Sequence, residues 1–165
     1  MVTHAPRRYV SDVVNSNNFD SSTIQNSVSQ TQYIGGTTNI ADGLRQLNVS
    51  IYNTNNGARS GFPDLAYVVL GGTSNTNSDQ VLPIAYALKS RGVQLVVVGI
   101  SNQTSMAEMQ AIASYQSDIY QVPNYGSLAV QGFTDVLVGQ TCPTSTGGLY
   151  FCFRLDDCFA FRFML

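Results

Sequence analysis

Residues 65–100 decide the fold of this chain, and they read LAYVVLGGTSNTNSDQVLPIAYALKSRGVQLVVVGI. The stretch opens with a short apolar run at 65–70 and closes with a second one at 93–100. Both runs are rich in β-branched residues and are bounded by glycine, which is typical of strands buried on both faces of a parallel sheet.

The segment between these two runs has the pattern of a helix. Ser78 or Asp79 is placed to cap its start, Pro83 falls in its early turns, and Gly92 is placed to end it. Its apolar stripe recurs at helical spacing and consists of Val81, Ile84, Ala85 and Leu88. Strand, helix and strand together predict a βαβ unit with a right-handed crossover.

The same alternation continues on both sides of this unit. Ser105 and Glu108 have the spacing of a capping box at the start of a helix that follows the second strand. The whole pattern predicts an α/β fold, with a mainly parallel sheet that helices cover on both faces. The further elements expected are helices at 22–30, 40–52, 105–113 and 125–138, a short strand at 118–122 and an edge strand at 9–14.

Composition excludes several classes of protein. The chain has 165 residues, which is enough for one domain with an ordinary core. Charged residues make up 11%, against about 25% in a typical soluble domain, and the net charge is −2. No basic patch can form from so few cations, so we expect no nucleic-acid binding. No apolar run approaches the length of a membrane span, and the first residues do not form a signal peptide.

The end of the chain differs from the rest. Composition changes at a Thr-, Ser- and Gly-rich seam at 143–148, after which phenylalanines alternate along the sequence. We therefore predict a domain over 9–142 and a separate tail over 143–165, which is either an apolar hairpin or a segment foreign to the domain. The cysteines are Cys142, Cys152 and Cys158, and their odd number leaves one thiol unpaired within the chain.

Catalytic motifs are missing from the sequence. His4 is the only histidine, and neither a Gly-x-Ser-x-Gly elbow nor a phosphate-binding glycine loop occurs. Residues 71–74 follow a strand and are placed to line a ligand crevice, but no Lys or Arg is near to hold a phosphate. We predict that the protein is not an enzyme. The alternative is a ligand-binding or catalytic α/β domain fragment, such as part of a nucleotide-using enzyme.

The stretch at 33–44, YIGGTTNIADGL, places two glycines and two hydroxyls just before a helix that starts at Ile40. It resembles a metal-site loop of the von Willebrand factor type A (VWA) domain, which has the form Gly-Gly-x-Thr-x-x-x-x-Ala/Gly-Leu. The order of the predicted elements agrees with this family over 9–142. The resemblance implies a Rossmann-like VWA fold that here lacks the first strand, first helix and second strand.

The resemblance also implies what has become of the family's metal site. Intact VWA domains bind Mg²⁺ at the metal-ion-dependent adhesion site (MIDAS) through an Asp-x-Ser-x-Ser loop, a Thr and an Asp. Here Thr38 matches the Thr, Gly71 or Gly72 stands where the Asp is expected, and the Asp-x-Ser-x-Ser loop is absent. We therefore expect a vestigial site at Thr38 and no cofactor in this chain. The structural interpretation of Thr38 is a cap for the helix from Ile40.

The function implied by the resemblance is a protein–protein interaction module of an extracellular matrix or adhesion protein. The parent protein would be secreted, with matrix or adhesion proteins as partners, and Cys142 would be the half-cystine that closes the domain. The sequons at Asn48 and Asn102 are candidates for glycosylation. Ligand binding without metal would use the loops at the carboxyl ends of the strands, including 101–105 and the residues Gly36, Thr37, Thr38, Asn39, Gly72, Thr73 and Ser74.

Overall fold

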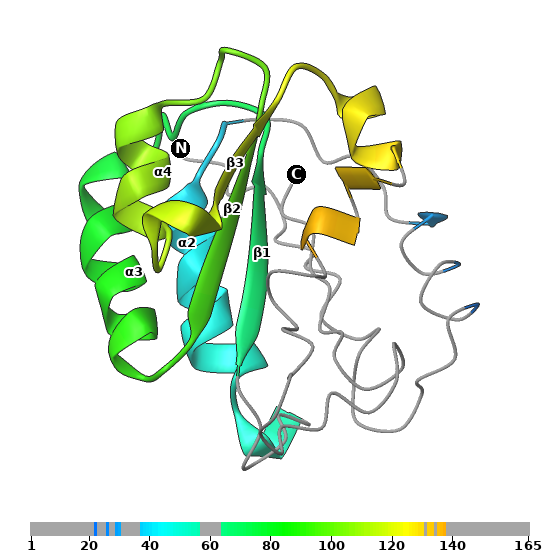
Figure 1. The fold of residues 1–165 in the computed structure, drawn as a ribbon. Helices are drawn as coiled ribbons and strands as arrows, with labels where there is room; N and C mark the ends of the chain where they lie inside the picture. The colour runs from blue at the N-terminus through cyan, green and yellow to red at the C-terminus, as the bar shows by residue number, and fades with distance from the viewer. Residues whose placement is uncertain are drawn as a thin grey trace.

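In the part of the chain that the structure describes, three parallel strands form the central sheet (Figure 1). The computed structural model describes residues 22, 26, 29–30, 37–56, 64–130, 132–133 and 135–137. Within them the strands are β1 (Leu65–Leu70), β2 (Gln94–Ile100) and β3 (Ile119–Val122), and β2 lies between the other two. The register pairs Leu65 with Gln94 and Val97 with Ile119.

Three helices cover one face of this sheet (Figure 1). They are α2 (Ile40–Gln46), α3 (Val81–Ser90) and α4 (Met106–Ile112). The first of them continues as a π-helical segment, Leu47–Ile51. Helix α3 connects β1 to β2 and α4 connects β2 to β3, so both connections are βαβ crossovers. Within the described residues no helix has the length and the apolar character needed to cross a membrane.

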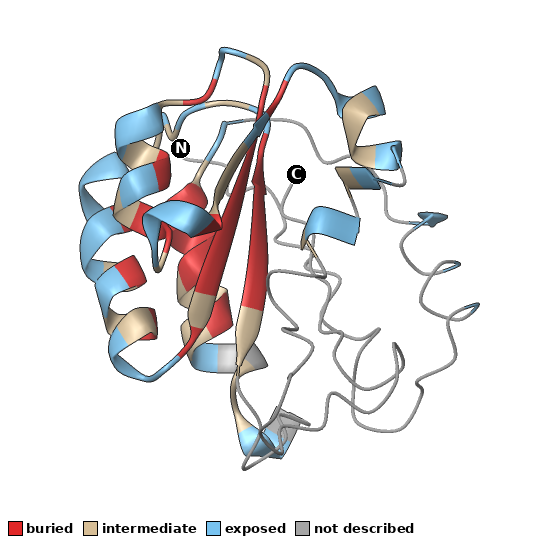
Figure 2. Ribbon diagram, viewed as in Figure 1, coloured by how far each residue is buried: buried red, intermediate tan, exposed pale blue. Residues whose placement is uncertain are grey.

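Both faces of β1 and β2 are buried along nearly their whole length, as Figure 2 shows by their red colour, whereas in β3 only Val122 is buried. The helix-side core joins alternate strand residues to all three helices, and the apolar stripe of α3 faces it as predicted. The opposite face packs under the segment that follows β3. Removal of this apolar surface from water is the main favourable term in folding. The residues of the second core are Val69, Val98, Ile100 and Val122, with Tyr120, Leu128, Phe133 and Leu137 packed on them.

Gly99 lets α4 approach β2 closely. A Cβ atom at this position would collide with the sulfur of Met109, and it would lie 2.7 Å from Oγ1 of Thr104. Both neighbours are themselves buried, so neither has free space to move into.

Lys89 connects α3 to the C-terminal end of α4. Its ammonium group donates to the carbonyl of Ala111 at 3.0 Å and to that of Ala113 at 3.1 Å. Carbonyls at a helix C-terminus lack partners within the helix and carry partial negative charge, so a cation suits this position.

Several predicted helix boundaries differ from the structure. Ser78 and Asp79 do not cap α3: they lie in a 3₁₀ turn, Ser78–Gln80, which follows Asn77 with a left-handed φ of 53°. The C-terminal boundary is confirmed, because Gly92 has a φ of 88°, which glycine adopts without strain.

The helix predicted over 125–138 is wrong at its start. Tyr125–Ala129 is a 3₁₀ turn in which Asn124 accepts from the backbone amide of Ser127, and Val130 is extended with ψ 120°. Residues 132–133 and 135–137 are helical. Upstream, Ser22, Asn26 and Ser29 are helical, in line with the helix predicted there. The strand predicted at 9–14, the three cysteines and the tail over 143–165 lie outside the described residues.

Candidate functional site

Three loops meet where the parallel strands end (Figure 1). Residues 37–39 lead into α2, residues 71–77 follow β1, and residues 101–105 follow β2. In open α/β sheets the carboxyl ends of the strands form the usual ligand-binding edge. We call this set of loops the C-terminal edge.

The middle loop is tied to its neighbours on two sides. The carbonyl of Thr38 accepts from the backbone amides of Asn75 at 3.1 Å and Thr76 at 3.2 Å. On the other side, Oε2 of Glu108 in α4 accepts from the backbone amide of Ser74 at 2.9 Å. The loop over 71–77 is therefore fixed by hydrogen bonds of its own backbone.

The bond to Glu108 also corrects the capping prediction for α4. Oγ of Ser105 accepts from the Glu108 amide at 3.4 Å, so the serine caps the helix as expected. The Glu108 carboxylate reaches out to Ser74 instead of back to Ser105, so only half of the capping box forms.

Thr38 does not cap α2, contrary to the structural interpretation of this residue. The cap is Asn39, whose Oδ1 accepts from the amide of Asp42 at 3.0 Å. Asn39 directly precedes the first helical residue, and its own φ of −123° is non-helical, as is usual for an N-cap residue. Thr38 contributes its carbonyl to the neighbouring loop, and its side chain is exposed.

The candidate residues divide into exposed and supporting ones. Thr37, Thr38 and Thr73 are exposed on the C-terminal edge, whereas Gly72 and Ser74 are half-buried. Gly36 lies outside the described residues.

The described residues do not fit the Mg²⁺ site that the family implies. Gly71 and Gly72 offer no side-chain oxygen, and a Cβ at Gly71 would collide with the hydroxyl of Tyr125. The Glu108 carboxylate is engaged by Ser74. Across the part of the chain that the structure describes, no three residues of His, Cys, Asp and Glu gather. A hard cation requires several oxygen ligands in near-octahedral geometry, and Thr38 alone does not provide them.

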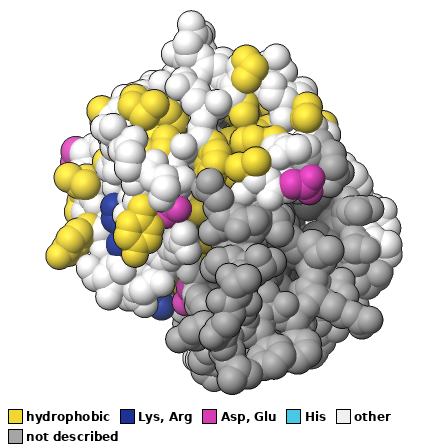
Figure 3. Space-filling view, viewed as in Figure 1, with side chains coloured by type: hydrophobic (Ala, Val, Ile, Leu, Met, Phe, Trp, Pro, Cys, Tyr) yellow, Lys and Arg dark blue, Asp and Glu magenta, His cyan; other side chains and the backbone are white. Residues whose placement is uncertain are grey.

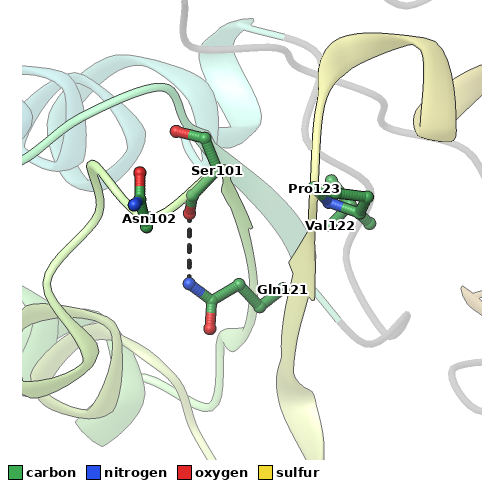
Figure 4. Close-up of a pocket in the computed structure, with 5 residues that line it drawn as sticks. All are labelled: Ser101, Asn102, Gln121, Val122 and Pro123. Carbon is green, nitrogen blue, oxygen red and sulfur yellow. Dashed lines mark hydrogen bonds between the residues drawn. The ribbon is translucent and has the colours of Figure 1, made fainter.

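A shallow pocket lies between the ends of β2 and β3 (Figure 4). Its walls are built around Ser101, which has a φ of 64° and whose amide donates to the carbonyl of Val122 at 2.7 Å. Nε2 of Gln121 donates to the Ser101 carbonyl at 3.1 Å. Sequence reasoning included 101–105 but missed Gln121 and Pro123, which reach this edge because β3 pairs with β2.

The C-terminal edge is nearly neutral. Its side chains are mainly hydroxyls and amides, and Figure 3 shows few charged side chains on the described part of this view. The shifted titratable groups lie elsewhere. Burial raises the pKa of Asp64, partly offset by Arg91, and burial lowers the pKa of Lys89. Burial and the charge of Asp118 raise the pKa of Tyr120.

Solved structures show what fold this chain shares. Proximal thread matrix protein 1 from the mussel byssus matches with a TM-score of 0.68 and 19% identity, over 73% of this chain. A second crystal form of that protein, and a third structure described as having a zinc occupied MIDAS motif, each match with a TM-score of 0.67. The present chain spans only 30–31% of the length of these structures.

The sequence comparisons point in the same direction. No curated protein matches the chain. The von Willebrand factor type A domain, as a family, matches residues 2–135. The parallel sheet, the helices that cover one of its faces and this match over most of the chain agree, and we conclude that the chain belongs to the VWA family.

Proposed function

We propose that this chain is a non-enzymatic interaction module of an extracellular matrix or adhesion protein, which binds protein partners through its C-terminal edge. The observation that carries the proposal is the fixed loop over 71–77, bonded to Thr38 on one side and Glu108 on the other. A loop ordered before binding loses less conformational entropy when a partner docks, which favours affinity.

The chemistry of the edge supports a binding role over catalysis. Its exposed side chains, such as Thr37 and Thr73, offer hydrogen bonds to a partner but no general base or phosphate-binding cation. The rival, a ligand-binding or catalytic α/β domain, would require such a group at the strand ends. Thr38 is in our proposal a vestige of the metal site, and docking at this edge requires no cation.

Secretion of the parent protein is part of the same proposal. It is supported by the matrix origin of the mussel protein that shares the fold, and by the sequons at Asn48 and Asn102. We keep the domain at 9–142 and the tail at 143–165 as proposals, with Cys142 as the closing half-cystine.

The test is binding to an array of purified extracellular matrix proteins, with the Thr73→Lys variant beside the wild type. Thr73 is exposed on the C-terminal edge, so a bulky charge there should weaken binding to any captured partner by about tenfold or more. The matched control is Asn55→Lys, an exposed position in the Thr54–Asn56 turn near the opposite end of the sheet (Figure 1).

Two results would overturn the proposal. One is equal loss of binding in both lysine variants, which would place the contact elsewhere. The other is loss of binding when EDTA is added, which would mean that a cation completes the site.

A further inference from the structure

The two sequons, at Asn48 and Asn102, lie in different structural environments, and this difference predicts which of them is glycosylated. We propose that Asn102 carries an N-linked glycan in the secreted protein, that Asn48 does not, and that the glycan covers part of the C-terminal edge. The inference rests on the extracellular location proposed above, since N-glycans are added to chains that enter the secretory pathway.

Asn102 stands at the tip of a tight, exposed turn. The bonds that hold this turn are made by the residues on either side. Oγ of Ser101 accepts from the Gln103 amide at 3.2 Å, and the Thr104 hydroxyl donates to the Ser101 carbonyl at 3.4 Å. The Asn102 side chain is exposed, and Figure 4 shows it apart from the Gln121–Ser101 bond. A sugar attached here displaces no contact that the turn depends on.

Asn48 is held by a neighbouring element. Nη1 of Arg91, at the end of α3, donates to both the backbone carbonyl and Oδ1 of Asn48. Nη2 of the same guanidinium donates to the carbonyl of Tyr52 at 2.8 Å. Asn48 is half-buried in the π-helical segment, so a glycan on its side-chain amide would lie against the Arg91 guanidinium. Glycans are bulky and require open surface.

The modification is a group transfer from a lipid-pyrophosphate-linked oligosaccharide. Nδ2 of Asn102 attacks the anomeric carbon, and a C–N bond forms as the bond from that carbon to the pyrophosphate oxygen breaks. The lipid pyrophosphate leaves with the bonding electron pair. One amide proton is passed to a base of the transferring enzyme.

The position of Asn102 gives the glycan a consequence for binding. The residue borders the pocket formed with Gln121 and Pro123. Three residues further along the chain, Ser105 caps α4, whose Glu108 holds the loop over 71–77. A branched sugar at Asn102 would therefore shield the surface beside the loops on which a partner would dock. We expect it to weaken docking there.

The test of occupancy uses the chain fused to a secretion signal and produced in eukaryotic cells. All of the chain recovered, secreted or retained, is digested and its sequon peptides are analysed by mass spectrometry. We expect glycan on Asn102 in the wild type and in Asn48→Gln, and none in Asn102→Gln. Thr104→Ser keeps the sequon and a hydroxyl at a buried position, and it should stay glycosylated. An unmodified Asn102, or a glycan on Asn48, would overturn the proposal.

The test of shielding compares the glycosylated chain with the same chain after enzymatic removal of the glycan, on an array of purified matrix proteins. We expect removal to strengthen binding severalfold. Equal binding before and after removal would overturn the shielding. Failure of the deglycosylated chain to bind any matrix protein would count against the proposed function instead, while the mass spectra would still decide occupancy.

Discussion

At the scale of single residues, two charged side chains of this chain make specific bonds between distant elements. Glu108 is the only glutamate and Lys89 the only lysine. The first accepts from the Ser74 amide, and the second donates to carbonyls at the end of α4. With charged residues at 11% of the chain, each such contact has few substitutes. Single substitutions should therefore separate the roles of neighbouring residues.

Asn39 and Thr38 are the sharpest such pair. Replacing Asn39 with Ala removes the acceptor for the Asp42 amide and should lower the free energy of unfolding by about 1 kcal/mol. Thr38→Ala is the matched control and should change it by less than about 0.5 kcal/mol, because the Thr38 side chain is exposed. Urea unfolding of both variants measures the difference. A larger loss of unfolding free energy in Thr38→Ala than in Asn39→Ala would show that Thr38 caps the helix.

Asp64 should give stability a particular pH dependence. Burial raises its pKa above 3.8, so the folded state binds this proton more readily than the unfolded state. The contribution of Asp64 to stability is therefore fully present below about pH 3.8 and is lost as pH rises through the folded pKa. We expect Asp64→Asn to be more stable than the wild type at neutral pH, with the gap closing on acidification. Urea unfolding across this pH range measures the gap, and a gap that widens in acid would contradict the assignment.

At the scale of elements, the sequence predicted the βαβ unit well and the element ends poorly. β1, α3 and β2 follow from local apolar patterns, which burial on both faces of the sheet produces directly. The carbonyl of Thr38 accepts instead from the backbone amides of a loop distant in sequence, which no local pattern indicates. Gln121 joins the candidate site only through the pairing of β3 with β2. Contacts between elements of this kind leave no periodic pattern in the sequence.

The contact between β2 and α4 leaves no room for a side chain at Gly99. Gly99→Ala would push a methyl group against Met109 and Thr104, and we expect a loss of about 1–3 kcal/mol in the free energy of unfolding. Gly72→Ala is the control, since a Cβ there meets no atom within 4 Å, and it should be nearly neutral. Guanidinium unfolding of the two variants provides the comparison. Equal stability would mean that α4 shifts away from the sheet without cost.

At the scale of the whole molecule, the described part of the chain is a parallel sheet with an apolar core on each face and a mostly neutral surface. The layers leave some large apolar groups on the outside, notably Leu82 at 58% and Tyr86 at 69% exposure on the outer face of α3. The polar C-terminal edge lies at the carboxyl ends of the strands.

The whole fold should be indifferent to divalent cations. A ligand at 100 times its dissociation constant stabilises the folded state by about 2.7 kcal/mol, which raises the Tm by several degrees in a chain of this size. Because the described residues do not fit a hard-cation site, we expect the same Tm in Mg²⁺ and in EDTA. Differential scanning calorimetry provides the measurement. A saturable rise in Tm with Mg²⁺ would show that a working site exists.

The single lysine has a practical consequence for proteolysis. A protease that cuts only after lysine has one peptide bond to attack in the whole chain, between Lys89 and Ser90. That bond lies in the last turn of α3, where the lysine ammonium is bonded to the end of α4. Cleavage therefore requires α3 to unwind and release α4. The rate at which two fragments accumulate then measures how often this helix pair opens, without any label on the protein.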